Sequence, residues 1–164
     1  LALSWHLLRE VDEVDRPACL TFVERDPERL AEMRGRHRQW SVRSNVRYVL
    51  SEDPDASDRL VSELPPGSLV ANATGLGKDG PGSPLTAAAR FPERGFAWDF
   101  NYRGDLLFLA QARAQADGRR LHVEDGWTYF LHGWTRVIAE VFQCEIPVRG
   151  PAFDELARLA ATAR

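Results

Sequence analysis

Residues 68–77 read SLVANATGLG, a short apolar run that passes into a loop of small and polar residues. The run at 68–71 has the length and composition of a buried strand. Glycine and proline then recur from 72 to 84, which indicates a loop. If the strand belongs to a parallel sheet, polar side chains just after its end, here Asn72 and Thr74, stand where ligands bind.

The segments on either side alternate between strand and helix patterns. Strand patterns stand at 18–23, 46–50, 95–100 and 120–123, and helical patterns at 1–10, 26–37, 55–64, 105–117, 126–142 and 152–162. Such alternation predicts βαβ units and a parallel sheet, and right-handed crossovers place helices on both of its faces. We therefore expect an α/β fold with a doubly wound, mostly parallel sheet, formed by residues 1–164 as one domain.

The bulk composition excludes several classes of protein. With 21 Lys and Arg against 24 Asp and Glu, the net charge is −3, and the basic footprint of a nucleic-acid-binding protein is missing. No apolar run reaches the roughly 18 residues that a membrane span requires. Cys19 and Cys144 lie outside any CxxC spacing, and no histidine pair has metal-ligand spacing. We expect reduced thiols, no metal ion and a cytoplasmic protein.

The amino-terminal stretch LALSWHLLRE predicts an amphipathic helix with Leu1, Trp5 and Leu8 on one face. It lacks the basic start and the cleavage site of a signal peptide. Because this helix opens without a capping residue, we expect that further chain precedes Leu1.

The turn after the first predicted strand offers a candidate binding site. An acidic residue at such a strand end can bind the ribose hydroxyls of a dinucleotide, and Glu24 stands there. Arg25 favours the opposite interpretation, because a guanidinium pairs with a 2′-phosphate. A solvated turn with an ordinary helix cap at Asp26 explains the same residues, so both interpretations stay open.

Two later strand ends carry further candidates. Phe100 and Tyr102 lie on one face of the strand at 95–100, and Tyr102 would place a phenol at its carboxyl end. Gly126 opens the helix at 126–142, where a glycine permits close backbone approach. The alternatives are a tyrosine at the edge of the core and a helix capped by Asp125.

Taken together, these segments match an ordered signature. In order come Asn72-Ala-Thr-Gly-Leu-Gly77, Ser83-Pro-Leu85, Asp99-Phe-Asn-Tyr102 and Asp125-Gly126. The sequence resembles the shikimate and quinate dehydrogenases, whose motifs are N-A-T-x-x-G, S-P-L, D-x-x-Y and D-G. The turn at 23–29, Val-Glu-Arg-Asp-Pro-Glu-Arg, is similar to the family's N-R-T-x-x-R turn. The resemblance covers residues 1–142.

The resemblance implies a Rossmann-like, NAD(P)-binding domain of a two-domain oxidoreductase of aromatic amino acid biosynthesis. Such an enzyme transfers a hydride between nicotinamide and a ring hydroxy or keto acid such as shikimate, 3-dehydroshikimate or quinate. By resemblance, the cofactor-binding residues would be Glu24, Arg25, Arg29, Asn72, Ala73, Thr74, Phe100 and Gly126, and Tyr102 would contact the substrate. The acidic Glu24 in place of the family's Asn favours NAD over NADP.

Several departures from the family pattern bear on function. The family's first strand and glycine-rich phosphate loop would precede Leu1, and its catalytic Lys–Asp pair lies in an amino-terminal substrate domain, so no catalytic residue is expected in this chain. Lys78 stands where the family often has Met. Gly133 stands where the family has a substrate-binding Gln, and the proline that usually follows the strand tyrosine is replaced by Arg103-Gly104. The helices at 126–164 would pack towards the substrate domain.

These departures leave other functions open. One alternative is a non-catalytic NAD(P)-binding module. Another is a different dehydrogenase with a related domain, such as a methylene-tetrahydrofolate dehydrogenase or a glutamyl-tRNA reductase, although the D-x-x-Y and D-G motifs argue against both.

Overall fold

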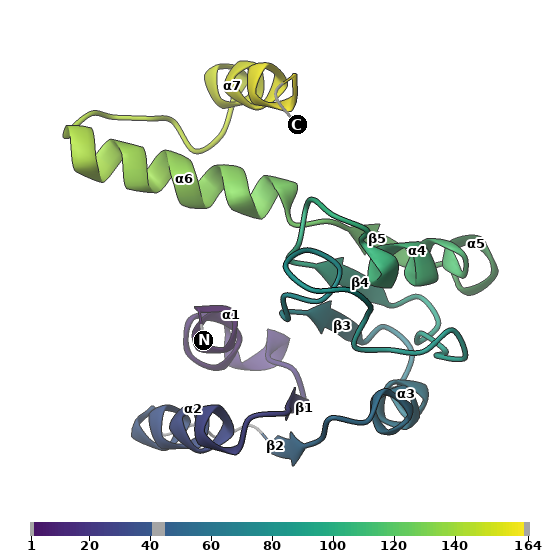
Figure 1. The fold of residues 1–164 in the computed structure, drawn as a ribbon. Coiled ribbons are helices and arrows are strands. Elements are labelled where there is room, and N and C mark those ends of the chain that lie inside the picture. Colours follow the sequence, from purple (N-terminus) through teal and green to yellow (C-terminus); the bar gives the residue numbers. More distant parts are fainter. Residues whose placement is uncertain (1, 41–44, 163–164) are drawn as a thin grey trace. The chain divides into compact units, whose positions relative to one another are not determined.

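The computed structural model describes residues 2–40 and 45–162. The chain forms two compact units, Leu1–Ser57 and Asp58–Arg164, called unit 1 and unit 2 below. Figure 1 shows the elements of each unit in chain order.

Unit 1 is built on a parallel β-α-β crossover. Its elements are α1 (Ala2–Trp5), a π-helical turn η1 (His6–Glu10), a 3-10 turn η2 (Glu13–Asp15), β1 (Cys19–Glu24), α2 (Pro27–Gln39) and β2 (Asn45–Leu50). Strands β1 and β2 pair in parallel along their whole length, from Cys19 opposite Asn45 to Glu24 opposite Leu50. The helix expected after the first strand is confirmed, since the Asp26 carboxylate accepts the backbone N–H of Glu28 and Pro27 occupies the first turn.

A buried histidine organises the interior of unit 1. His37 of α2 is only 3% exposed. Its Nδ1 lies 2.7 Å from the Tyr48 hydroxyl of β2, and its Nε2 lies 3.1 Å from Ser4 Oγ of α1. The rings of Phe22 and Trp40 pack against it at centroid distances of 5.0 and 4.8 Å. Each ring nitrogen thus has a partner, and the three bonded residues tie α1, α2 and β2 together.

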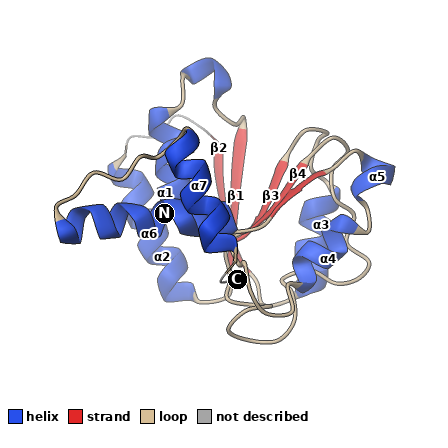
Figure 2. Cartoon of the chain, turned by 90° about the horizontal axis from the view of Figure 1, so that it is seen from above, coloured by secondary structure: helices blue, strands red, loops and turns tan. Residues whose placement is uncertain are grey.

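Unit 2 contains a three-stranded parallel sheet in the order β3-β4-β5. Its strands are β3 (Leu69–Asn72), β4 (Phe96–Asp99) and β5 (His122–Glu124), and its helices are α4 (Leu107–Arg113), α5 (Ala116–Arg119), α6 (Trp127–Phe142) and α7 (Pro151–Ala161). Helix α3 (Pro54–Ser62) crosses the boundary between the units. Figure 2 shows α3 and α4 beside the strands of this sheet.

One face of this sheet carries the core of unit 2. Phe91 and Phe108 are almost fully buried and meet edge to face at a centroid distance of 5.5 Å. The same cluster contains Val61, Leu85, Ala89, Ala97, Ala112 and Leu121. Along β4 the exposure alternates, because Ala97 is buried whereas Phe96 is 49% exposed. The core therefore lies on the face that also holds Asp99.

The helix predicted at 126–142 is confirmed as α6, but only some of its apolar side chains are buried. Of the apolar side chains, Leu131 is buried, whereas Trp134, Val137, Ile138, Val141 and Phe142 are exposed. Helix α7 contacts α6 through Phe153, whose ring stacks on His132 at 4.4 Å. Packing of these helices against another domain stays a prediction.

The alternating α/β pattern and the parallel strand pairing are confirmed. The described residues form two small parallel sheets, of two and three strands, and a single doubly wound sheet stays a prediction. The helix expected at 105–117 is wrong in its bounds, since it begins at Leu107 and is interrupted before Ala116. Its start is delayed because Leu106 takes a left-handed conformation, φ 47°, while its N–H bonds to Gly77 O.

Candidate functional site

In unit 1, the β1–α2 turn positions Glu24 at the end of the strand. The Glu24 carboxylate folds back, and its Oε1 accepts the backbone N–H groups of Arg25 at 2.8 Å and Asp26 at 3.1 Å. Its Oε2 makes no hydrogen bond with any residue in the described ranges. One oxygen therefore fixes the side chain, and the other is available to accept a ligand hydroxyl.

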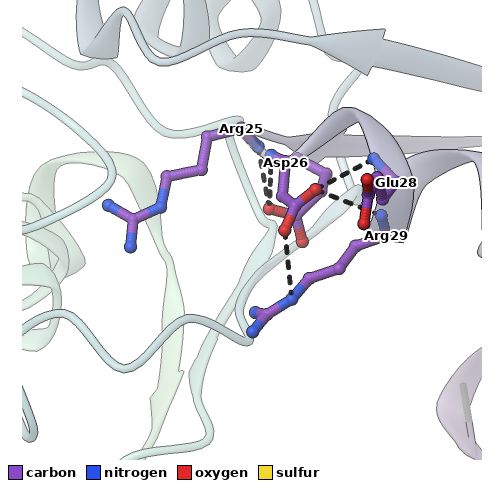
Figure 3. Close-up of polar contacts among 5 residues, drawn as sticks. Arg25, Asp26, Glu28 and Arg29 are labelled. Carbon is purple, nitrogen blue, oxygen red and sulfur yellow. Dashed lines mark hydrogen bonds and ion pairs between the residues drawn. The ribbon is translucent and has the colours of Figure 1, made fainter.

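The two arginines of this turn, Arg25 and Arg29, differ in their contacts (Figure 3). Asp26 Oδ1 accepts the N–H groups of Glu28 and Arg29, and Arg29 Nε lies 3.6 Å from Asp26 Oδ2. Figure 3 shows the Arg29 side chain folded towards Asp26 and the Arg25 side chain extended away from the turn. Among the described residues Arg25 has no ion-pair partner, so of the two it is the better placed to meet an anionic ligand.

In unit 2, a buried carboxyl group lies at the carboxyl end of β4. Asp99 is 0% exposed. Its Oδ1 accepts Asn72 Nδ2 at 3.1 Å and the backbone N–H of Asn101 at 3.0 Å, whereas its Oδ2 has no hydrogen-bond partner among the described residues. Burial raises the pKa of Asp99, the two hydrogen bonds oppose this shift, and the charge of Asp125 adds to it. The neutral acid is therefore favoured more than in an exposed aspartate.

The amide side chains beside Asp99 hold the loop after β3. Asn72 Oδ1 accepts both the backbone N–H and the Oγ1 hydroxyl of Thr74, at 3.0 and 2.7 Å. Asn101 Nδ2 donates to Thr74 O and Leu76 O, each at 3.1 Å. Asn72 and Asn101 are 1% and 5% exposed. These buried side chains thus fix the conformation of the loop, whose Ala73 and Thr74 are exposed.

Asp99 and Asn101 both help to hold the loop after β3, a role that the sequence did not predict for them. The available signal was their spacing, since residues two apart on a strand share a face. Their alignment with Asn72, which lies opposite Asp99 in the sheet register, required the strand pairing.

Gly126 brings the start of α6 against the end of β4. Its N–H donates to Asn101 O at 3.0 Å, and a Cβ at this position would lie 2.0 Å from Phe100 O. Only glycine fits this approach. Asp125 Oδ1 accepts the N–H of Trp127, the first residue of the helix, at 2.9 Å, whereas the N-cap position itself is Gly126 and has no side-chain cap hydrogen bond among the described residues. The Gly126 N–H is used within the protein, and its role at a cofactor stays a prediction.

An aromatic cluster borders the same strand end. The Phe100 ring stacks on Tyr129 at 5.2 Å, and the Tyr102 ring packs against Phe130 at 4.3 Å and Trp127 at 5.5 Å. The predicted residues of unit 2 therefore gather at the carboxyl ends of β3 and β4 and the start of α6, whereas Glu24, Arg25 and Arg29 gather at the β1–α2 turn of unit 1.

Other chemical features of the chain are sparse. Within residues 2–40 and 45–162, no group of three or more His, Cys, Asp and Glu could hold a metal ion. Lys78 Nζ lies 3.5 Å from Asp79 Oδ2. None of the helices in the described part of the chain combines the length and the apolar character needed to cross a membrane.

Comparison of the chain with family models, with curated protein sequences and with solved structures finds no match in any of the three. The features that bear on function are the two strand-end clusters, one at the β1–α2 turn of unit 1 and one at the carboxyl ends of β3 and β4 in unit 2.

Proposed function

We propose that the chain is the NAD(P)-binding part of an oxidoreductase that transfers a hydride to or from a ring hydroxy or keto acid, with shikimate or quinate as the type of substrate. One observation carries the proposal: a loop of small residues stands at the carboxyl ends of parallel strands and is held in place by buried amide side chains. Ligands of parallel α/β sheets bind at this position, and a preformed loop lowers the entropic cost of binding.

Each cluster has a separate role in this proposal. In unit 1, Glu24 Oε2 accepts a ribose hydroxyl, and its negative charge disfavours a 2′-phosphate, so NAD is preferred over NADP. Arg25 is the residue that would accommodate a phosphate. Arg29 is held by Asp26 and contributes less.

In unit 2, small side chains allow a flat ring to approach the loop at Ala73 and Thr74, while the rings of Phe100 and Tyr102 supply an apolar border. The cofactor would supply the hydride chemistry, and this chain's residues bind and orient it. No side chain of the chain is assigned an acid or base role.

A non-catalytic NAD(P)-binding module is the second candidate. The observation that favours it is that Asn72, Asp99 and Asn101, the buried polar side chains at this edge, are directed to one another and to the loop backbone. Such side chains hold a binding loop and are not placed to move a proton on a substrate.

The test is binding of NAD⁺ and NADP⁺ to the 164-residue chain, followed in ¹H–¹⁵N spectra because we expect weak affinity. NAD⁺ should shift the amides of Arg25 and Thr74, and Glu24→Gln should weaken NAD⁺ and strengthen NADP⁺ several-fold. Glu28→Gln, which removes the same charge in the first turn of α2, is the matched control. Absence of shifts with both cofactors would contradict the proposal.

Turnover distinguishes the two candidates. Oxidation of shikimate or quinate with NAD⁺, measured on the intact protein through the absorbance of reduced nicotinamide, supports the oxidoreductase. Cofactor binding by the intact protein without turnover of either acid supports the binding module. The 164-residue chain alone is expected to turn over neither acid.

A further inference from the structure

A cavity of unit 1 lies between helix α2 and strand β2, apart from the residues assigned above. Its volume is about 460 Å³, within the range of roughly 300–1,000 Å³ that small-molecule sites occupy. Seven residues line it: Pro27, Leu30, Ala31, Arg34, Arg38, Tyr48 and Leu50. Neither Glu24 nor Arg25 is among them.

Two arginines meet on one side of this cavity. Arg34 and Arg38 stand one turn apart on α2, so they share a face of the helix. The Arg34 guanidinium carbon lies 5.0 Å from the centroid of the Tyr48 ring. Arg38 lines the same cavity as Tyr48, and the charges of both arginines lower the pKa of the Tyr48 phenol, which burial raises. Among the described residues neither arginine has a carboxylate partner.

The remaining lining consists of aliphatic side chains and the ring of Tyr48. Leu50 is 54% exposed, a high value for a leucine on a strand, and Leu30 is buried beneath the helix. The Tyr48 hydroxyl is bonded to His37 Nδ1 at 2.7 Å, which fixes the orientation of its ring. The cavity thus combines two unneutralised guanidinium groups with an aromatic ring and aliphatic side chains.

We propose that this cavity binds an aromatic acid, a planar ring that carries a carboxylate or phosphate group. The guanidinium groups of Arg34 and Arg38 take the anionic group through charge-assisted hydrogen bonds. The ring of the ligand lies against Tyr48 and Leu50 and removes that apolar surface from water. A bare inorganic anion would leave the apolar lining unused, and a neutral ring would leave the two cations unpaired. The proposal does not depend on the function proposed for the strand-end clusters.

Calorimetry with phenyl phosphate and with benzoate on the 164-residue chain tests the proposal and distinguishes phosphate from carboxylate. At least one of the two should bind with 1:1 stoichiometry. Arg34→Gln and Arg38→Gln keep most of the side-chain length and remove one charge each, and each should weaken binding by about tenfold. Arg36→Gln is the matched control, because Arg36 is on the same helix, is paired with Glu32 at 2.7 Å and does not line the cavity.

A substitution of Leu50 tests the contribution of the apolar lining of the cavity. Leu50→Ser should weaken phenyl phosphate several-fold and leave the weak binding of inorganic phosphate unchanged. Thermal unfolding followed by circular dichroism checks that each variant folds, which is expected because all the substituted side chains are exposed.

Four results would overturn the proposal. The first is that neither acid binds. The second is that inorganic phosphate binds as tightly as phenyl phosphate, which would show that the ring contributes nothing. The third is that Arg36→Gln weakens binding as much as the other two arginine variants, which would show a general charge effect. The fourth is displacement of the probe by NAD⁺, which would make the cavity an extension of the cofactor site.

Discussion

Units 1 and 2 each bury an ionisable side chain, and they treat it differently. In unit 1, both nitrogens of His37 have hydrogen-bond partners, and the rings of Phe22 and Trp40 pack against the imidazole. In unit 2, Asp99 has partners for one oxygen, and the other has none among the described residues. The hydrogen bonds of His37 join α2 to α1 and β2. Among the described residues, Asp99 keeps one unsatisfied oxygen buried at the carboxyl end of β4, while its other oxygen accepts hydrogen bonds from Asn72 and Asn101.

The largest expected effect concerns Asp99, where two substitutions distinguish the loss of the acceptor oxygen from the loss of the charge. Asp99→Ala leaves Asn72 Nδ2 and the Asn101 N–H buried without an acceptor, which should lower the free energy of unfolding by about 2–4 kcal/mol. Asp99→Asn keeps an acceptor oxygen of the same shape and removes the cost of a buried charge, but it places an amide NH2 group where Oδ2 has no partner among the described residues, so it should destabilise less than Asp99→Ala. Urea unfolding followed by circular dichroism measures both. An Asn variant as unstable as the Ala variant would mean that the ionised form holds the loop.

The next effect concerns the approach of α6 to β4. Gly126→Ala would place a Cβ 2.0 Å from Phe100 O, and relief of this overlap should cost about 1–3 kcal/mol. Gly133→Ala is the matched control on the same helix, where a Cβ meets nothing within 4 Å. It should stabilise the helix by about 0.5–1 kcal/mol, because alanine is the better helix former. The two substitutions are thus expected to shift the thermal midpoint in opposite directions.

The two buried groups should also respond oppositely to acid. Burial lowers the pKa of His37 from its ordinary value of 6.5, so unfolded chains take up the proton first. The stability of unit 1 is then complete above pH 6.5 and falls as the pH drops from 6.5 towards the lower pKa of the folded state. Asp99 has a raised pKa, so folded unit 2 takes up the proton first and gains stability as the pH drops through that pKa towards 3.8.

Hydrogen exchange resolved by residue can follow both units in one sample as the pH is lowered. His37→Gln should remove part of the acid sensitivity of unit 1, and Asp99→Asn should remove the gain in unit 2. Parallel changes in both units, unaffected by these variants, would contradict the contrast between them.

The two clusters also differ in how far the sequence predicts them. The β1–α2 turn is local, and the capping pattern Asp26-Pro27 predicts the start of the helix, which the structure confirms. The loop after β3 depends on residues about 27 positions apart, since Asn72 meets Asp99 only through the parallel register of β3 and β4. Periodicity located both strands but carried no information on their pairing.

Long-range packing explains the remaining differences. The apolar residues along 126–142 recur with the period of a buried helix face, yet Val141 and Phe142 are 69% and 72% exposed, because an amphipathic pattern specifies an apolar face and not its partner. The start of α4 is set by the bond from Leu106 N–H to Gly77 O, a contact between two loops that no local pattern predicts.

The smallest expected effect tests whether the β1–α2 turn is as local as the sequence suggests. Asp26→Ala removes the acceptor for the N–H groups of Glu28 and Arg29 and should cost unit 1 about 1 kcal/mol. Asp26→Asn keeps the cap and weakens only the contact with Arg29, which at 3.6 Å on an exposed surface contributes little, so its effect should be within about 0.5 kcal/mol of zero. Urea unfolding measures both, and exchange rates in unit 2 should not change with either. A loss with Asp26→Asn as large as with Asp26→Ala would show that the ion pair, and not the cap, holds the turn, and Arg29 would then share the role given to Asp26.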